Sequence, residues 1–372
     1  MRWTDSFEND DTATGEKQEY RFGPDLRSMD SLSTDSNPPA ANSNRELPPP
    51  RSLESVGSVA PDVLVLPAFA YEPPLDERGP WLDRYAVDDA LEVPGTDSPL
   101  YLTEENVAIT TTGIGKSDAA ATVSALFAAD GLDLTSTTVV STGIAGGSPS
   151  RVALGSVVLA DWIVDWDRKH RWDPREARTG AEPDRVVEGE TAAGTENRHP
   201  GERDGRGDDR PPIDLLAYRP RDYVHRVNDE LLEEALDAVS AVDLQDRADV
   251  RAYRERYPDA TDGVPSIEVG TTVCGDEFWH GRRHAAEVQW LCERYGAGAY
   301  VTTQMEDAAT ATVLERFDAL DRYLSVRSVV NYDRPAAGQT VEESFDGTPE
   351  SLEQGVVNLI RVGGAIVDRL LE

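Results

Sequence analysis

The sequence predicts an α/β fold in which a mostly parallel sheet is flanked by helices. Apolar runs typical of buried strands, such as Val63–Leu66, alternate along the chain with segments whose apolar residues recur at helical spacing. Two glycine-rich segments, Thr112–Asp118 and Ser141–Gly147, each follow a β-type run. Open α/β sheets bind polar ligands at the carboxyl ends of their strands, where glycine lets a ligand approach the backbone closely. We therefore expect a small-molecule site at these two turns.

Strands and helices are expected to alternate from about Asp62 to the C-terminus. Strands are expected at 63–66, near 100–112, and at 137–142, 155–164, 267–273, 299–304 and 324–331. Helices are expected at 117–129, 223–240, 280–295, 306–322 and 350–371. Ser117 can cap the first of these helices, and Asp118 in its first turn suits the helix dipole.

Two parts of the chain lack the pattern of a folded core. Residues 1–58 are rich in Ser, Pro, Asp and Asn and have few branched apolar residues, which predicts a disordered polar and acidic extension. Residues 177–212 are charged and rich in glycine and proline, which predicts an exposed insertion. Apart from this insertion, residues 59–372 are expected to form a single domain.

The chain is strongly acidic. It has 372 residues, with 70 Asp and Glu against 36 Lys and Arg, and a formal net charge of −34. Nucleic acids and anionic membranes bind basic surfaces, so this charge argues against both as partners. Lysine is rare and acidic residues occur along the whole chain. This composition resembles that of cytosolic proteins from salt-loving archaea, in which concentrated salt screens the repulsion; the alternative is an acidic protein from an ordinary habitat.

Neither a membrane span nor a secreted state is expected. No stretch reaches the roughly 18 uncharged apolar residues that a spanning helix requires, because Arg361 and Asp368 interrupt the most apolar segment, 356–371. The first residues lack the apolar core of a signal peptide. The two cysteines, Cys274 and Cys292, are too few for a disulfide framework or a thiolate metal site. We therefore expect a cytoplasmic protein without a bound metal.

The first glycine-rich turn resembles part of two nucleotide-binding motifs but completes neither. Gly115–Ser117 matches the end of a phosphate-binding P-loop, yet Thr110 stands where that motif requires its first glycine. The dinucleotide fingerprint fails as well, because Asp118 stands where it requires its third glycine. Backbone N–H groups at such turns can still bind phosphate or an attacking water molecule. The candidates for this role are Gly113, Gly115, Thr142 and Gly143.

Five motifs occur along the chain. Four of them are Gly113-Ile114-Gly115-Lys116, Ser141–Gly147 with the Leu154–Val158 run after it, Gly275-Asp276-Glu277-Phe278, and Met305-Glu306. The fifth is a pair of segments, 165–176 and Phe278–Gly281. They resemble the motifs of the nucleoside phosphorylase and nucleosidase superfamily, and most closely those of its purine nucleoside permease family. The resemblance runs from about Asp62 to the C-terminus, without the 177–212 insertion. It implies a nucleoside phosphorylase-like fold, with a mixed, mostly parallel sheet flanked by helices, and a purine nucleoside as ligand.

The resemblance places the sugar at Met305 and Glu306 and the base at Phe278. Cleavage of the bond between ribose and purine develops positive charge on the sugar, which a carboxylate at Glu306 could stabilise while it accepts hydrogen bonds from ribose hydroxyls. Met305 suits a wall against the sugar, and Phe278 could stack on the purine. The alternatives are a helix-dipole charge for Glu306 and ordinary core packing for Phe278.

The leaving base needs a proton or a hydrogen-bond donor, and two residues at the end of a predicted strand are candidates. Asn331 occupies the family's position by alignment with the strand, but an amide cannot protonate the base. Asp333 could do so if burial raises its pKa, or it could be a simple turn residue.

The nucleophile and one histidine have two interpretations each. In the superfamily, nucleosidases place a glutamate near the first strand to activate water, whereas phosphorylases hold phosphate there with glycine amides and arginines. The loop after the first strand lacks glycine, and Glu72 in it is either the base or only a cap of the loop. His280 is either a structural residue or a polar contact to the ligand.

The sequence thus favours an enzyme that cleaves the N-glycosidic bond of purine nucleosides by phosphate or by water. It implies no cofactor, with phosphate as a possible co-substrate. The family's name suggests a second hypothesis, a non-catalytic nucleoside-binding protein that assists uptake. A homo-oligomer is expected.

Overall fold

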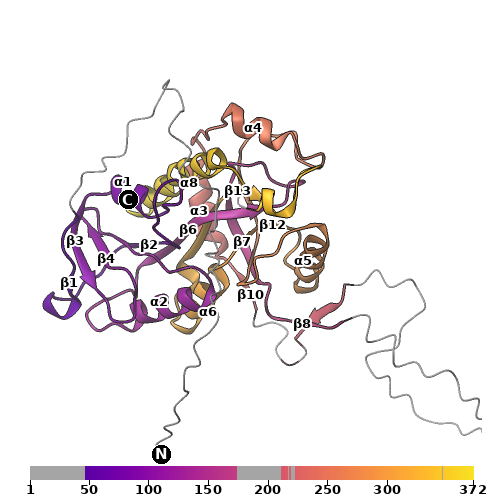
Figure 1. The fold of residues 1–372 in the computed structure, drawn as a ribbon. Coiled ribbons are helices and arrows are strands. Elements are labelled where there is room, and N and C mark those ends of the chain that lie inside the picture. Colours follow the sequence, from indigo (N-terminus) through magenta and orange to yellow (C-terminus); the bar gives the residue numbers. More distant parts are fainter. Residues whose placement is uncertain (1–46, 174–210, 217, 219–222, 346) are drawn as a thin grey trace, which may run out of the picture. The chain divides into compact units, whose positions relative to one another are not determined.

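The computed structural model describes residues 47–173, 211–216, 218, 223–345 and 347–372, all within one compact unit that spans 41–372 (Figure 1). Of the predicted extension and insertion, residues 1–46 and 177–210 lie outside the described residues. The end of the predicted extension, residues 47–58, is folded: Arg51–Ser52 is a strand that pairs with a neighbour, and Leu53 is buried in the core. The prediction of disorder is wrong there, because Leu53 and Val56 find apolar partners.

Most strands form one large sheet. Its strands within the described residues are β1 (Arg51–Ser52), β2 (Val63–Pro67), β3 (Val87–Glu92), β4 (Leu100–Thr103), β5 (Val107–Ile109), β6 (Thr138–Gly147), β7 (Val157–Asp165), β10 (Val224–Arg226), β11 (Ile267–Cys274), β12 (Tyr300–Gln304) and β13 (Tyr323–Tyr332). Their order is β1-β3-β4-β5-β2-β6-β12-β11-β7-β10, and β13 pairs with both β6 and β7. A separate pair joins β8 (Lys169–Arg171) to β9 (Ile213–Leu215).

The sheet is mixed, as the sequence predicts. Its strands are parallel where β5, β2 and β6 adjoin and where β12, β11 and β7 adjoin. Antiparallel pairs occur between β3 and β4, between β10 and β7, and where β12 meets β6. Every residue of β2 is buried, as expected of a strand inside a parallel sheet that is covered on both faces. The predicted α/β architecture is confirmed.

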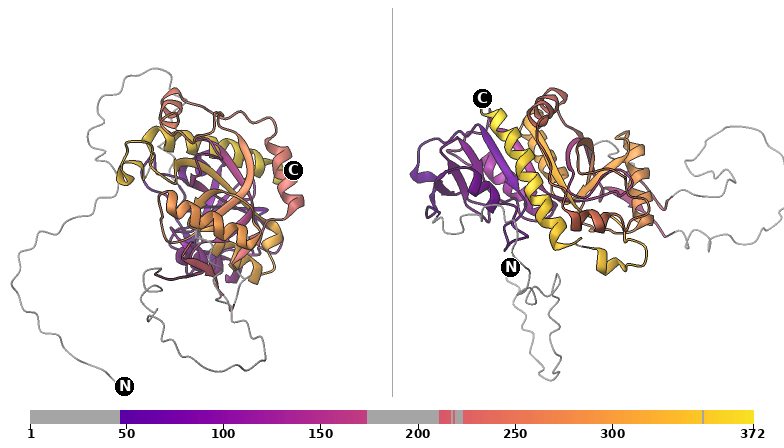
Figure 2. Two further views of the ribbon diagram at one scale, coloured as in Figure 1. Left: turned by 90° about the vertical axis from the view of Figure 1, so that its right-hand side faces the viewer. Right: turned by 90° about the horizontal axis from the view of Figure 1, so that it is seen from above.

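Helices lie on both sides of this sheet. They are α1 (Gly79–Arg84), α2 (Lys116–Ala128), α3 (Asp229–Val239), α4 (Ala248–Arg254), α5 (Arg282–Tyr295), α6 (Asp307–Arg316), α7 (Val341–Ser344) and α8 (Pro349–Leu370). The long helix α8, yellow in Figures 1 and 2, packs on β6, β13 and β7 through an apolar face that includes Leu359, Val362 and Ile366. Helices α2 and α6 pack against each other, and Figure 1 shows them on the other side of β6 from α8.

The second glycine-rich segment differs from its prediction. Ser141–Gly147 is not a turn, because β6 continues through it and pairs with β13 and β12. A Cβ atom on Gly147 would lie 2.7 Å from the side chains of both Val152 and Val329. Glycine in this strand therefore permits close packing of neighbouring side chains, and it does not bend the chain.

Three other elements end at different residues than expected. The strand expected near 100–112 is the antiparallel pair β4 and β5, joined by a turn in which Asn106 has φ 63°. The helix expected at 223–240 is β10 followed by α3, whose first turn is capped by the Asn228 side chain. The helix expected at 306–322 is α6, which ends at Arg316 shortly before Asp318 adopts φ 54°.

Candidate functional site

The first glycine-rich turn meets Glu306 directly. The turn follows β5, and in it Gly113 and Gly115 have φ values of 84° and 88°, which glycine adopts without strain. The Gly115 N–H donates a hydrogen bond of 3.0 Å to the Glu306 carboxylate, and 191 positions separate the two residues in sequence. The structure thus brings together two predicted site residues from distant parts of the chain.

Glu306 is buried beside a cation. It immediately precedes α6, and its carboxylate lies 3.3 Å from Nη1 of Arg327. Burial raises the pKa of Glu306, and Arg327 opposes that rise. Arg327 also pairs with Asp307, whose carboxylate accepts further hydrogen bonds from Ser141 and Tyr323. Glu306 is less fully hydrogen-bonded than Asp307, so it keeps oxygen lone pairs for a ligand.

A second carboxylate, Glu77, is buried close to the same arginine. It lies between β2 and α1, and its oxygens accept hydrogen bonds from the N–H groups of Ala68 at 2.8 Å and Ile144 at 2.7 Å. A Cβ atom on Gly143 would lie 2.6 Å from Nη1 of Arg327 and 2.8 Å from Oε1 of Glu77. The two side chains therefore approach each other over Gly143, which only glycine permits.

The protonation of Glu77 is set by this position. Burial raises its pKa to about 7, with Glu306 adding to the rise and Arg327 opposing it. A side chain with such a pKa can take up a proton near neutral pH. Glu72, the predicted candidate base, is exposed in the loop that precedes Glu77. Of these two glutamates between β2 and α1, the buried one is Glu77.

The predicted backbone donors already have partners in the chain. The Gly113 N–H donates to the carbonyl oxygen of Ala68 at 2.9 Å. Thr142 is fully buried in β6, where it pairs with Pro67 of β2 and Val326 of β13. The Thr142 hydroxyl has no hydrogen-bond partner among the described residues. Of the N–H groups predicted to bind an anion, those of Gly113 and Gly115 are thus used within the fold.

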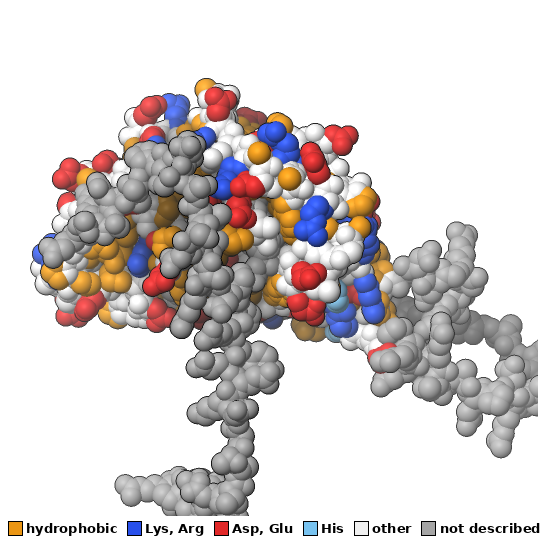
Figure 3. Space-filling view, turned by 45° about the horizontal axis from the view of Figure 1, so that its top comes forward, with side chains coloured by type: hydrophobic (Ala, Val, Ile, Leu, Met, Phe, Trp, Pro, Cys, Tyr) orange, Lys and Arg blue, Asp and Glu red, His pale blue; other side chains and the backbone are white. Residues whose placement is uncertain are grey.

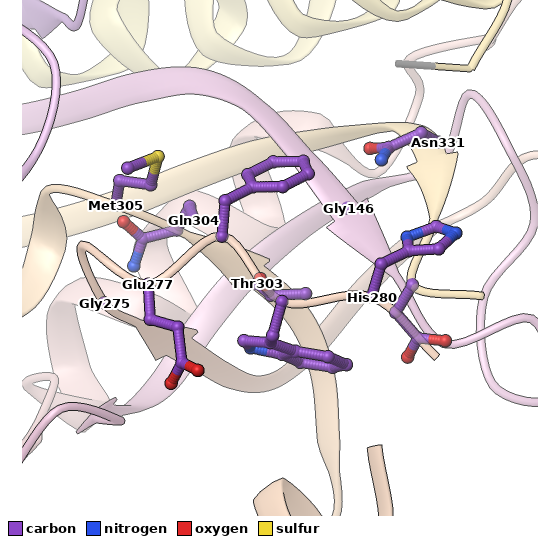
Figure 4. A pocket seen from close by; sticks show the side chains of 11 residues that line it. Gly146, Gly275, Glu277, His280, Thr303, Gln304, Met305 and Asn331 are labelled. Carbon is purple, nitrogen blue, oxygen red and sulfur yellow. The ribbon is translucent and has the colours of Figure 1, made fainter. Parts of the chain in front are cut away.

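A pocket opens at the carboxyl end of β12 and reaches Met305, but the neighbouring Glu306 does not line it. Its lining residues are Gly146, Gly275, Glu277, Phe278, Trp279, His280, Thr303, Gln304, Met305, Asn331 and Asp333. In Figure 4, Met305 and Gln304 lie at one end of the group, and His280 and Asn331 lie at the other. Five predicted site residues therefore line one pocket: Phe278, His280, Met305, Asn331 and Asp333.

Aromatic rings narrow this pocket. Phe278 is 49 % exposed and stacks on Phe345, with ring centroids 4.5 Å apart. His280 also stacks on Phe345, at 5.5 Å. The pocket volume is about 30 Å³, enough for about two water molecules, so a nucleoside can enter only if the pocket widens. Because Phe278 is half-exposed at the pocket, the alternative of ordinary core packing does not describe it.

The two candidates at the end of β13 have different surroundings. The Asn331 Nδ2 donates to the carbonyl oxygen of Phe345 at 2.7 Å, and a Cβ atom on Gly146 would lie 3.3 Å from Oδ1. The carbonyl fixes the orientation of the amide, so Oδ1 is the atom left to accept a hydrogen bond from a ligand. The buried Asp333 carboxylate accepts hydrogen bonds of 2.6 Å from both the Tyr300 hydroxyl and the Arg334 Nε.

His280 combines a structural contact with a place in the pocket wall. Its Nε2 lies 2.6 Å from the Ser344 hydroxyl, which donates to the carbonyl oxygen of Val341. Burial lowers the pKa of His280, which favours the neutral ring. Nδ1 is buried and has no partner among the described residues. Because the Ser344 hydroxyl uses its hydrogen on Val341, the Nε2–H tautomer fits, and Nδ1 is then an acceptor.

Lys116 joins the glycine turn to the segment that carries Phe278. Its Nζ lies 2.8 Å from carboxylate oxygens of both Asp165 and Asp167. Its N–H donates to Asp276 at 2.6 Å, and the Asp276 N–H donates to Asp167 at 2.7 Å. Burial lowers the pKa of Lys116, but the two aspartates outweigh burial and the pKa is raised. Lys116, which matches the lysine of a P-loop in sequence, therefore holds two loops together by binding carboxylates.

Three side chains at the site are missing from the residues predicted from the sequence. Glu77 lies in the run Asp76–Gly79, which looks like any charged turn. Arg327 carries a usable signal, because a charge inside an apolar strand needs a buried counter-charge. Gln304, at the end of β12, has no feature in the sequence that marks it as a site residue.

Some function classes find no support in the described parts of the chain. No helix there is both long and apolar enough to cross a bilayer, and no cluster of three His, Cys, Asp or Glu side chains there could hold a metal ion. Cys274 and Cys292 are buried free thiols, and burial raises the pKa of Cys292 to about 12. Figure 3 shows acidic side chains scattered over the visible face, with basic ones among them.

Comparison with known proteins gives a family for the chain. A family model described as purine nucleoside permease (NUP) matches residues 60–372. The chain is 29 % identical over 278 residues to a probable purine nucleoside permease of Schizosaccharomyces pombe, covering 72 % of this chain and 77 % of that protein. It is 26 % identical over 314 residues to a purine nucleoside permease of Candida albicans, covering 80 % and 72 %.

Solved structures share the fold. A 5′-methylthioadenosine/S-adenosyl homocysteine nucleosidase from Helicobacter pylori is similar with a TM-score of 0.51 and 17 % identity, covering 84 % of this chain and 99 % of that one. The nucleoside phosphorylase-like fold expected from the sequence is thereby confirmed.

Proposed function

The chain belongs to the purine nucleoside permease family, and from that premise we propose that it binds purine nucleosides and hydrolyses their N-glycosidic bond. The sugar lies against Met305 and Glu306, and the base lies between Phe278 and Asn331. Support comes from the pocket, whose wall combines the half-exposed ring of Phe278 with Met305 and Asn331.

Glu306 supports the sugar. Its carboxylate is held by the Gly115 N–H and keeps lone pairs for two ribose hydroxyls. When the bond from C1′ to N9 breaks, positive charge develops on the sugar. A carboxylate fixed in a buried site stabilises this charge far better than one in water.

Glu77 is the observation that carries hydrolysis. With a pKa of about 7, its carboxylate can take a proton from a water molecule while the water oxygen forms a bond to C1′. The electron pair of the C1′–N9 bond leaves with the purine, which takes up a proton from solvent, and Glu77 then releases its proton to solvent. Asn331 Oδ1 then accepts a hydrogen bond from the protonated edge of the base. The products are free ribose and free purine.

Phosphorolysis has less support because several of the groups that could bind an anion at the site already have partners in the chain. The N–H groups of Gly113 and Gly115 donate to oxygen atoms of the chain, and Arg327 is paired with two carboxylates. The carboxylates of Glu77 and Glu306 would also repel phosphate.

A second candidate function is nucleoside binding without cleavage, as part of uptake. The family's description favours it, and so does Asp333. The carboxylate of Asp333 is bound by Tyr300 and Arg334, so it is not poised to protonate a base.

A base-release assay separates these functions. The protein is incubated with adenosine or inosine in concentrated KCl, with and without phosphate, and free base is measured by chromatography. We expect release without phosphate. Release only with phosphate would assign phosphorolysis, and binding without release would favour the second candidate.

A matched pair of variants tests the sugar site. Glu306→Gln keeps the shape of the side chain and removes its charge, and we expect turnover to fall about 10²–10³-fold. Glu315→Gln makes the same change on the exposed face of α6 and should leave turnover unaltered. Equal turnover in both variants would remove Glu306 from the mechanism.

A further inference from the structure

The side chain of Gln304 has one end bound and the other end unused. It is 6 % exposed, and its Oε1 accepts hydrogen bonds from the N–H groups of Glu306 at 2.7 Å and Asp307 at 3.0 Å. Its Nε2 is buried and has no hydrogen-bond partner among the described residues. Buried polar groups are almost always hydrogen-bonded, and one without a partner costs free energy. An unpaired donor here therefore calls for an explanation.

The orientation of this carboxamide follows from its partners. The first N–H groups of a helix have no acceptor within the helix, and only the oxygen of a carboxamide can accept from them. Oε1 thus faces the start of α6, and Nε2 is the atom left for the pocket. Gln304 lines that pocket, and Figure 4 shows it close to Met305 and Gly275.

We propose that Gln304 Nε2 donates a hydrogen bond to N3 of the purine base. The inference rests on the proposed function, which puts the sugar at Met305 and Glu306 and the base beyond them. Gln304 directly precedes the sugar-binding pair and shares the pocket with Phe278 and Asn331, so it lies where sugar and base join. Beside N9, the purine presents C8–H on one edge and N3 on the other. Only N3 accepts a hydrogen bond.

Gln304 would then be a positioning residue with two effects. One end of the amide fixes the base, and the other end fixes the first turn of α6 and with it Glu306. A hydrogen bond donated by Nε2 polarises the amide and strengthens the bonds that Oε1 accepts. Binding of the base and placement of the carboxylate are thereby linked through one side chain.

The test compares adenosine with 3-deazaadenosine, in which C–H replaces N3. Dissociation constants are measured for the full-length protein and for Gln304→Met by rapid mixing, from the change in tryptophan fluorescence that precedes cleavage of the ligand. We expect the unmodified protein to bind adenosine about tenfold more tightly than 3-deazaadenosine, and Gln304→Met to bind the two equally. The loss of the α6 contacts in Gln304→Met weakens both ligands alike, so the ratio reports only the hydrogen bond to N3.

A second variant and two controls complete the experiment. Gln304→Glu keeps the acceptor for α6 but replaces the donor, and it should weaken adenosine about tenfold or more while affecting 3-deazaadenosine less. Gln289→Glu, on α5, should keep the ratio of the unmodified protein. The ligand 7-deazaadenosine, altered at the other edge of the base, should depend on Gln304 as adenosine does.

Two results would overturn the inference, and they differ in what else they remove. If the unmodified protein binds adenosine and 3-deazaadenosine equally, the contact to N3 is wrong and the proposed function stands. If it binds neither compound, the proposed function fails together with the inference.

Discussion

At the scale of single residues, Glu77 is expected to control the pH dependence of cleavage. A base acts only when it is deprotonated, and burial raises the pKa of Glu77 to about 7. Most Glu77 side chains therefore carry a proton at about pH 5 and few do at about pH 8. We expect kcat/KM for adenosine to rise about tenfold per pH unit below pH 7 and to level off above it.

Two glutamate variants check this assignment. Glu77→Gln should lower turnover about 10²–10⁴-fold and abolish the rise with pH. Glu72→Gln changes an exposed side chain of the same loop and should keep both turnover and the pH profile. A profile of the unmodified protein that is flat from about pH 5 to 8 would contradict a base with this pKa.

The pair Glu72 and Glu77 shows what the sequence leaves undetermined at this scale. Both residues lie in the loop after β2, and composition does not distinguish them. Asp76 begins α1 by accepting hydrogen bonds from the N–H groups of Arg78 and Gly79. That local turn, together with the N–H groups of Ala68 and Ile144, directs Glu77 inward. One of those two donors lies in a different strand, so the choice depends on tertiary structure.

At the scale of elements, Asn358 is expected to hold α8 to the sheet. This fully buried side chain accepts from the Gln245 N–H at 2.7 Å and donates to the carbonyl oxygens of Gly155 at 2.7 Å and Gln245 at 3.0 Å. Asn358→Leu would leave these backbone groups buried without partners. We expect it to lower the free energy of unfolding by about 3 kcal/mol, measured by urea denaturation.

Asn228 provides the matched comparison. It caps α3 by accepting from the N–H groups of Glu230 and Leu231 near the surface, where water can replace it. Asn228→Ala should therefore cost only about 1 kcal/mol. Equal effects of the two substitutions would show that Asn358 does not fasten α8 in the way described.

The elements that the sequence predicts well are those with a strong apolar period. β2, β11, β12 and α8 lie close to their expected positions because continuous burial or a helical stripe marks each of them. The segment Ser141–Gly147 is mistaken for a turn because its glycines suggest a bend. These glycines are required because side chains from distant parts of the chain crowd the strand, and no local sequence pattern shows that crowding.

At the scale of the whole molecule, the net charge of −34 is expected to make stability depend on salt. Repulsion among acidic side chains weakens the folded state, and KCl screens it. We expect the thermal midpoint to rise steeply up to about 1 M KCl, where the Debye length is about 3 Å, and slowly beyond.

Sucrose is the control for this measurement, because it stabilises proteins by exclusion without screening charge. Its effect should grow evenly with concentration and should lack the steep initial rise. A midpoint that does not change below about 1 M KCl would show that repulsion is not a major term.

The overall topology could be predicted in class but not in detail. Alternation of strands and helices indicates a parallel α/β sheet. It does not reveal that β13 joins β6 to β7 or that β12 runs antiparallel to β6. These pairings join strands that are remote in sequence, so they could be reached here only through resemblance to a known family. The same resemblance located five residues of the pocket.

The hydrogen bond between Gly115 and Glu306 has a consequence for biosynthesis. Its two partners are 191 positions apart, and the arginine beside Glu306 is made later still, in β13. A chain that is still being translated has its glycine turn long before it has its carboxylate. Every truncated translation product that ends before residue 327 should therefore fail to bind the ligand. The first appearance of ligand binding would show that synthesis is nearing completion.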